Sequence, residues 1–318
     1  MRDSGATKTL HWLVLVILAA CLPACASAPG RSAWFDGCQA LHDAARKMVD
    51  SDPATARLQW DKVLADEECK EFYPRCRFHL ARMDGEGGNS RAFEDGLVDL
   101  ARLYPDSYWG RRAVEELWTQ RVRLGDTLRF VKALSALYAA VNESTLAGHV
   151  LFYLAQAHLQ ADQPSPARAL YHLLILVDYY PHSALWDDGL WAAADVLNGL
   201  GRPGDEVRVL ELALVPNSAR GIDALADGFT GQVRLRLGRL YRRQGRYVEA
   251  ERQLSLVINI HPSIKLKDDA FWELARVYRF QGDRDREVRA LDYLVRFCPW
   301  SRHVKAARQR LQSRRVTE

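Results

Sequence analysis

The chain has 318 residues, of which 48% are hydrophobic and 26% are charged, and its formal net charge is +4. This composition is that of an ordinary folded protein and excludes a low-complexity or disordered chain. The charge is uneven. The segment Thr230–Glu318 holds 21 lysine and arginine residues against 10 acidic ones, so the rest of the chain is net acidic.

Residues 1–20 have the pattern of a secretion signal. Arg2 and Lys8 give a positive start, and the segment Leu10–Ala20 is an apolar run with one polar residue. The run is too short to cross a bilayer, which takes about 20 apolar residues. We therefore expect export of the protein, and this export argues against a nucleic-acid partner.

The end of that run, Leu18-Ala19-Ala20-Cys21, resembles the lipobox of bacterial lipoproteins. The resemblance implies that Cys21 is lipidated and that residues 21–32 form a lipidated N-terminus and tether; Cys25 is the alternative lipidation site. Two or more acyl chains would hold the protein on a membrane. Because Leu22 and not an aspartate follows Cys21, the resemblance favours the outer membrane, with the protein facing the periplasm. Ordinary cleavage after Ala26, which would leave a soluble secreted protein, is the other interpretation.

Residues 33–71 are expected to form an N-terminal helical hairpin. Cys38 lies early in its first helix and Cys69 follows its second helix, so the two thiols can meet across the hairpin. Export places them in an oxidising compartment, which makes a Cys38–Cys69 disulfide a candidate. Cys76 is a competing partner, and buried free thiols are the remaining alternative.

Residues 72–299 contain a repeated pattern that predicts about six helix–turn–helix units. The clearest unit carries Leu237, Gly238, Tyr241, Gly245, Tyr247, Ala250 and Pro262, and the next carries Leu274, Ala275, Tyr278, Gly282, Leu291 and Pro299. The two prolines are 37 positions apart, close to the roughly 34-residue period of tetratricopeptide repeats. The pattern predicts an all-α fold, a right-handed α-solenoid of antiparallel helix pairs, because each short pair buries its apolar faces only by stacking on its neighbours.

Earlier units follow the same plan. Boundaries between units are expected at Pro105, Pro181 and Pro216, with an unmarked one near Asn142–Ser144. Turns inside the units are expected at Gly85–Gly88, Gly125, Asp162, Gly201, Gly245 and Gly282. Residues 300–318 are expected to form a basic C-terminal capping helix.

Arginine residues with interleaved aromatic residues occupy the first helices of the last two units. At positions that tetratricopeptide proteins usually turn toward their concave groove, the sequence has Gln232, Arg239, Arg242, Arg243, Trp272, Arg276, Arg279 and Phe280. One interpretation is a clamp for the carboxylates of a protein partner, because guanidinium groups make bidentate charged hydrogen bonds. The other is a solvated helix face whose charges pair along the helix.

Motifs for catalysis, metals or cofactors are not found. The nine histidines form no HExxH pattern, no cysteine pair reads CxxC, and no phosphate-binding or dinucleotide-binding glycine motif occurs. The pairs Asp187-Asp188 and Asp268-Asp269 stand at helix starts, where carboxylates favour the helix dipole. The sequence therefore predicts a protein that is not an enzyme and has no cofactor, no bound metal and no small-molecule substrate.

The combination of a lipobox with such repeats resembles the tetratricopeptide lipoproteins of the bacterial envelope, especially the BamD-like and YbgF-like groups. The motif that carries the resemblance is aromatic-Pro-x-Ser, present as Tyr104–Ser107, Tyr180–Ser183 and, with cysteine in place of the aromatic residue, Cys298–Ser301. The resemblance implies a scaffold that binds envelope proteins, with β-barrel assembly components among the candidates. An accessory subunit of a secretion or peptidoglycan-remodelling complex is the alternative. A stand-alone hydrolase is disfavoured because the chain ends in repeats.

Overall fold

The computed structural model describes residues 29–215, 228–261 and 263–315, and these residues fold into α-helices joined by short connections. The chain begins with α2 (Pro29–Met48), α3 (Pro53–Ala65) and the short 3-10 helix η1 (Glu67–Phe72). Because α2 begins at Pro29, the end of the expected tether is already helical. The signal sequence, Cys21, Cys25, Pro216 and Pro262 lie outside the described residues.

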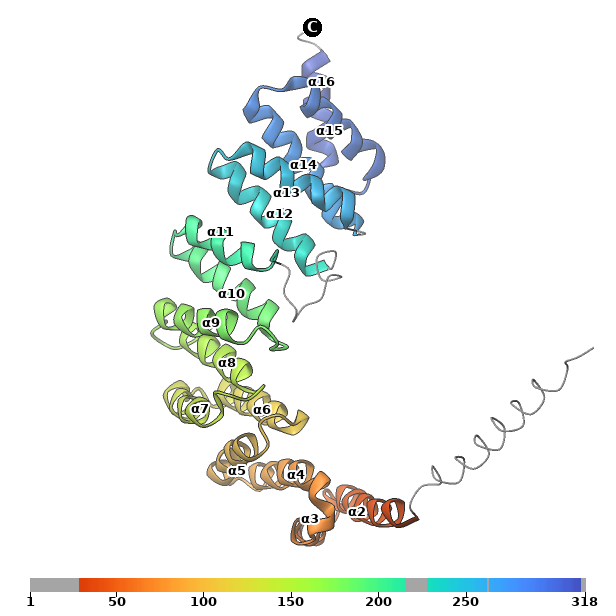
Figure 1. The fold of residues 1–318 in the computed structure, drawn as a ribbon, viewed down its shortest axis with the longest axis vertical. Helices are drawn as coiled ribbons and strands as arrows, with labels where there is room; N and C mark the ends of the chain where they lie inside the picture. Colours follow the sequence, from red (N-terminus) through yellow and green to blue (C-terminus); the bar gives the residue numbers. More distant parts are fainter. Residues whose placement is uncertain (1–28, 216–227, 262, 316–318) are drawn as a thin grey trace, which may run out of the picture. The chain divides into compact units, whose positions relative to one another are not determined.

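Antiparallel helix pairs follow in chain order (Figure 1). They are α4 (Tyr73–Glu86) with α5 (Ser90–Leu103), α6 (Tyr108–Leu124) with α7 (Thr127–Val141), α8 (Ala147–Leu159) with α9 (Pro166–Tyr179), α10 (Trp186–Gly199) with α11 (Pro203–Leu212), α12 (Gly228–Arg243) with α13 (Tyr247–Ile260), and α14 (Ile264–Gln281) with α15 (Arg284–Phe297). The last helix is α16 (Val304–Arg315). The all-helical repeat array predicted from the sequence is thus confirmed.

Glycine in the left-handed conformation ends the first helix of most pairs. Gly88, Gly125, Gly201, Gly245 and Gly282 have φ between 68° and 83°, a region in which glycine is favoured because it has no Cβ. In three of these turns the next residue is Asn89, Asp126 or Asp283. Its side chain caps the second helix by accepting a hydrogen bond from a backbone N–H three residues on.

A serine marks the start of the next pair. The Ser107 hydroxyl donates to the carbonyl of Tyr104 at 2.7 Å and accepts from the N–H of Gly110 at 2.9 Å. Ser144 makes the same kind of contacts at the boundary that has no proline, since its hydroxyl donates to Val141 and accepts from Leu146. The serine of the aromatic-Pro-x-Ser motif therefore caps the following helix.

The helices form two compact units, one that runs to Ala113 and one that starts at Val114, so the division lies within α6. In the first unit, Cys38 and Cys69 form a disulfide with Cα atoms 5.7 Å apart, and Trp60 and Phe72 pack in the same core. Cys76 and Cys298 are buried free thiols. The core of the second unit is continuous from α8 to α16, as stacking of repeats requires.

Candidate functional site: the first-helix face

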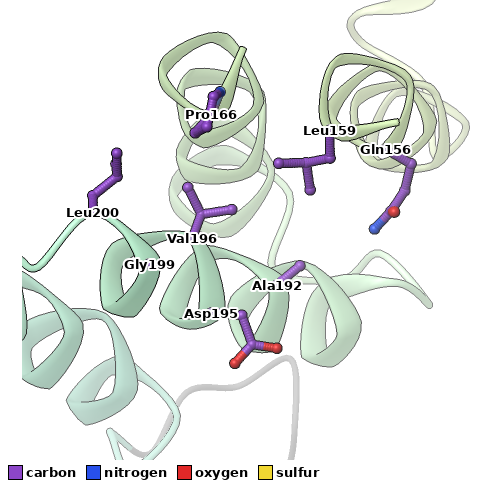
Figure 2. Close-up of a pocket in the computed structure, with 8 residues that line it drawn as sticks. All are labelled: Gln156, Leu159, Pro166, Ala192, Asp195, Val196, Gly199 and Leu200. Atoms are coloured by element: carbon purple, nitrogen blue, oxygen red, sulfur yellow. The ribbon is translucent and has the colours of Figure 1, made fainter. Parts of the chain in front are cut away.

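An open apolar pocket lies between successive helix pairs of the second unit. Its volume is about 500 Å³, and α8 contributes Gln156 and Leu159, α9 contributes Pro166, and α10 contributes Ala192, Asp195, Val196, Gly199 and Leu200. In Figure 2, Leu159 and Val196 approach the same space from α8 and α10, whereas the Asp195 carboxylate points away from them. We call the exposed side of α8, α10, α12 and α14 the first-helix face, because these are the first helices of their pairs.

Local sequence explains why the pocket is open. Ala192 and Gly199 are small, so α10 leaves space beside α8 where larger side chains would fill it. The start of α10 is fixed on α9 by Trp186, whose indole N–H donates to the carbonyl of Val177 at 3.0 Å. The pocket is therefore built on helices whose positions are set by buried contacts.

Beside the pocket, Arg236 of α12 forms ion pairs with residues of α10 and α11. Its guanidinium lies 2.6 Å from the Asp195 carboxylate of α10 and 2.7 Å from that of Glu206 in α11. It also lies over the Trp191 ring, 4.7 Å from the centroid. Glu206 is only 1% exposed, so this ion pair is largely removed from water and consequently screened little by salt.

Three arginine residues of the predicted stripe form ion pairs with the chain's own carboxylates. Arg239 pairs with Asp269 at 2.9 Å, Arg242 pairs with Glu273 at 3.0 Å, and Arg276 pairs with Glu273 at 3.2 Å. The Arg242 side chain is only 9% exposed. All three arginine residues thus have carboxylate partners on α14 within the chain, and the clamp for a partner's carboxylates stays a prediction. The pairs run mainly between repeats, not along one solvated helix.

The other predicted clamp residues divide into two groups. Trp272 stacks on His303 at a centroid distance of 4.9 Å and lies under Arg310 at 5.0 Å, so it anchors α16 and the segment before it. Arg243 and Arg279 are exposed, as are Gln232 and Phe280. These four residues are the exposed members of the predicted clamp, while Arg239 and Arg276 keep 35% of their side chains exposed.

Asp269 is the acceptor that sequence reasoning missed. Besides Arg239, it receives hydrogen bonds from Arg302 at 3.0 Å and from His303 at 2.8 Å. Burial by itself would raise the pKa of this carboxyl, but these partners outweigh it and hold the pKa below its usual value. Asp269 is thus a structural junction between α12, α14 and the start of α16, not a residue that only complements the helix dipole. The sequence did contain a signal for these ion pairs, because Asp269 and Glu273 follow Arg239 and Arg242 by about the length of one repeat.

Within the described ranges, no group of three or more histidine, cysteine or acidic side chains is arranged to hold a metal ion. A helix with the length and apolarity needed to cross a membrane is likewise not found among the residues that the structure describes.

A comparison with known protein families identifies one repeat of the chain. Residues 232–263, which span most of α12 and all of α13, match the model of the tetratricopeptide repeat. The flanking helix pairs follow the same antiparallel plan, so the described residues form an all-helical array of tetratricopeptide-like repeats. No curated protein sequence matches the chain.

Several solved structures match the chain at low sequence identity and low TM-score. A crystal structure of MamA is 15% identical over 58% of this chain and 90% of that chain, with a TM-score of 0.42. BtubC from P. vanneervenii is 15% identical over 70% of this chain and 90% of that chain, with a TM-score of 0.46. PilF of Pseudomonas aeruginosa is 15% identical over 76% of this chain and 97% of that chain, with a TM-score of 0.41. Because these scores are below 0.5, the similarities carry no functional conclusion.

Proposed function

We propose that this chain is a membrane-anchored scaffold that binds envelope proteins through the first-helix face, without catalysing a reaction. The observation that carries the proposal is the open apolar pocket between α8 and α10, in an array whose repeat class serves protein–protein interaction. Such a pocket can bury an apolar side chain of a bound segment, and burial of that kind supplies much of the affinity of protein complexes.

The polar surroundings of the pocket favour a defined orientation of that segment. Gln156 is half-buried at the pocket and Asp195, whose carboxylate points away from the apolar side chains, is 60% exposed beside it, so a ligand segment that extends beyond the pocket can hydrogen-bond to both. Asp195 is held in place by Arg236, which reduces the entropy lost when a partner binds. Affinity would come from the apolar anchor, and specificity from these two polar groups.

The cellular location is part of the same proposal. The apolar run that ends at Cys21 supports export and lipidation of that residue, which would place the scaffold on the outer membrane facing the periplasm. Envelope proteins, β-barrel assembly components among them, would then be the available partners.

The pocket is tested by mild crosslinking of the tagged protein in its own envelope, affinity capture and mass spectrometry. Leu200→Glu places a charge at the pocket, and Leu212→Glu is the matched control, because Leu212 is a similarly exposed leucine on α11 that does not line the pocket. We expect Leu200→Glu to lose the proteins that wild type and Leu212→Glu both retain. Equal capture by all three would contradict the pocket as the binding site.

The identity of the captured proteins separates the two candidate roles. Barrel-assembly components would support a role in outer-membrane protein assembly. A secretion or cell-wall enzyme, active only in the co-purified complex, would instead make the chain an accessory subunit of that system.

The anchor is tested separately by metabolic labelling with radioactive palmitate and by membrane fractionation of Cys21→Ser and Cys25→Ser. We expect Cys21→Ser to lose both the label and membrane association, while Cys25→Ser keeps both, because the residue at the end of the lipobox carries the acyl chains. Loss in Cys25→Ser alone would move the site to Cys25. Membrane association without any label would contradict the lipid anchor.

A further inference from the structure

The open pocket of the first-helix face has a charge of one sign. Its lining contains one carboxylate, that of Asp195, and no lysine or arginine, because the other lining residues are apolar, glycine or the uncharged Gln156. A ligand segment that places an apolar side chain between α8 and α10 therefore meets a negative charge at the lining and no positive one.

Arg236 does not cancel this charge, because it is shared by two carboxylates. Its guanidinium lies 2.6 Å from Asp195 and 2.7 Å from Glu206, and one positive charge against two negative charges leaves a formal charge of −1. The side chains of Arg236 and Glu206 are only 15% and 1% exposed, whereas that of Asp195 is 60% exposed. The negative charge that a partner can reach is therefore that of Asp195.

The Asp195 carboxylate has room for a second cation. A carboxylate can accept about four hydrogen bonds, and within the described residues Arg236 is the one ion-pair partner of Asp195. Figure 2 shows this carboxylate turned away from the apolar side chains, so a cation would meet it beside the pocket and not inside it. Because the next residue, Val196, lines the pocket, an extended segment anchored there reaches Asp195 within about three residues.

Other charges along the first-helix face are acidic on α10 and basic beyond it. Asp188 precedes Asp195 by seven residues, so it lies on the same side of α10, and it is exposed. On α12 and α14, Arg243 and Arg279 are exposed. A basic residue of a ligand segment is therefore attracted to the α10 part of the face and repelled by the α12 and α14 part.

From this charge distribution we infer that the segment bound by the first-helix face carries an apolar side chain with a lysine or arginine within about three residues of it. The inference rests on the proposed function, because it names the ligand of the same pocket. The apolar side chain fills the space between α8 and α10, and the basic side chain donates a charge-assisted hydrogen bond to Asp195. Segments with an acidic residue at that place are rejected, because two carboxylates would then face each other.

Replacement of Asp195 leaves the helices around the pocket in place. Arg236 keeps its ion pair with the buried Glu206 and its position over the Trp191 ring, 4.7 Å from the centroid. The exposed Asp195 side chain fills no space in the core. Asp195→Asn and Asp195→Lys are therefore expected to fold, which thermal unfolding checks before any binding is measured.

The test is a selection of short random peptides, displayed on phage, against the immobilised full chain. Wild type should enrich an apolar residue with a lysine or arginine close to it. Asp195→Asn should keep the apolar residue but lose the basic one, and Asp195→Lys should enrich an acidic residue in its place. Asp178→Asn is the matched control and should select as wild type does, because Asp178 is an exposed aspartate of α9 that does not line the pocket.

A synthetic copy of the most enriched peptide gives the size of the effect. In fluorescence anisotropy titrations we expect Asp195→Asn to weaken its binding about three- to fivefold, the range for an exposed ion pair. Added sodium chloride should weaken the binding of wild type more than that of Asp195→Asn. A peptide with glutamine in place of its basic residue should bind both proteins equally, which assigns the loss to this one pair.

The selection distinguishes a wrong ligand charge from a wrong pocket. If wild type and Asp195→Asn enrich the same residues beside a common apolar anchor, the basic partner is wrong, while the pocket remains a binding site. If Leu200→Glu enriches the same peptides as wild type, the pocket is not the binding site, and this inference and the proposed function are both wrong. The absence of any peptide that wild type enriches over Leu200→Glu has the same meaning.

Discussion

At the residue scale, Glu273 is the shared ion-pair partner of three arginine residues in the second unit. Its carboxylate is 7% exposed and lies within 3.4 Å of the guanidinium groups of Arg239, Arg242 and Arg276. Removing the Glu273 charge is costly, because it leaves Arg242, whose side chain is only 9% exposed, without its counter-ion and largely out of water. The carboxylate therefore stabilises the contact between α12 and α14.

We expect Glu273→Gln to lower the free energy of unfolding by about 3 kcal/mol, the magnitude found for breaking a buried ion pair. The control is Glu249→Gln. The Arg246–Glu249 ion pair has a similar N–O distance, 2.9 Å, but both of its side chains are 44% exposed. Exposed pairs of this kind contribute about 0–1 kcal/mol. Urea unfolding followed by circular dichroism measures both, and equal effects would show that the burial of Glu273 is unimportant.

Gly238 is a residue whose missing side chain sets a helix–helix distance. A Cβ at this position would lie 2.6 Å from the side chain of Leu254 on α13, closer than real Cβ contacts. We expect Gly238→Ala to destabilise the protein by about 1–2 kcal/mol through overpacking. Gly204→Ala, in the first turn of α11 and with open space around it, should be neutral or slightly stabilising, and thermal unfolding followed by circular dichroism measures both variants. A stabilising Gly238→Ala would mean that Leu254 moves aside at no cost.

At the element scale, one tyrosine on α12 and one on α14 form a hydrogen bond to the second helix of the preceding pair. Tyr241 of α12 donates to Glu211 of α11, and Tyr278 of α14 donates to Glu251 of α13 at 3.0 Å. Burial raises the pKa of both tyrosines, in the case of Tyr278 to about 12. The tyrosine position of the repeat thus has a second role beyond packing, since it joins neighbouring pairs by a hydrogen bond.

Histidines pair between α8 and α9. His158 and His172 stack with a centroid distance of 5.4 Å, and burial lowers the pKa of both, that of His172 to about 4. A histidine with a lowered pKa binds protons more readily in the unfolded chain. Its contribution to stability is therefore complete above the unfolded pKa of about 6.5 and is lost as the pH falls toward 4.

We accordingly expect the melting temperature to fall between pH 6.5 and pH 4, and to fall less steeply in His172→Gln, which has no imidazole to protonate. Differential scanning calorimetry across this pH range measures both slopes. His182→Gln, at an exposed histidine outside the helices, is the control and should keep the wild-type slope. Identical slopes in wild type and His172→Gln would exclude this histidine as a cause of acid sensitivity.

At the scale of the whole molecule, the two compact units differ in what stabilises them. The unit that ends at Ala113 contains the Cys38–Cys69 disulfide, whereas the described cysteine of the other unit, Cys298, is a free thiol. A crosslink between residues 31 positions apart restricts the unfolded chain and is worth about 3–4 kcal/mol in the loop-entropy model. Reduction should therefore affect one unit and spare the other.

We expect a reducing agent to shift a calorimetric transition that belongs to the first unit to lower temperature and to leave the transition of the second unit in place. The double variant Cys38→Ser, Cys69→Ser should resemble the reduced protein and should not respond to the reducing agent. If the whole chain melts in one transition that moves as a unit, the two units unfold cooperatively and the prediction is wrong.

The sequence predicted the repeats well because spacing alone determines them. Gly245 and Gly282 end first helices and Tyr241 and Tyr278 recur on the same helix face, and these features depend only on contacts within one repeat and its neighbour. Such short-range constraints leave a period that is visible in one chain.

Prediction of the site was weaker because side-chain partners come from different repeats. The arginine residues at positions 239 and 242 looked available to a partner, but Asp269 and Glu273 occupy them once α14 stacks beside α12. Trp272 looked accessible until α16 covered it. The pocket beside Val196 arises from small residues on α10, which carry no pattern of their own. Cavities formed by missing volume leave little trace in a sequence.

Asp269 pairs with residues on both sides of α14, with Arg239 of α12 and with Arg302 and His303 before α16. Successive first helices add to one another through arginine–carboxylate pairs, so an unprotected last repeat would offer the same pairing to another molecule and could grow into a head-to-tail filament. Arg302 and His303 occupy the Asp269 carboxylate, and Arg310 covers Trp272, before any such neighbour can. Arg302, His303 and Arg310 therefore cover the surface of α14 that a second copy of the chain would need for the same pairing.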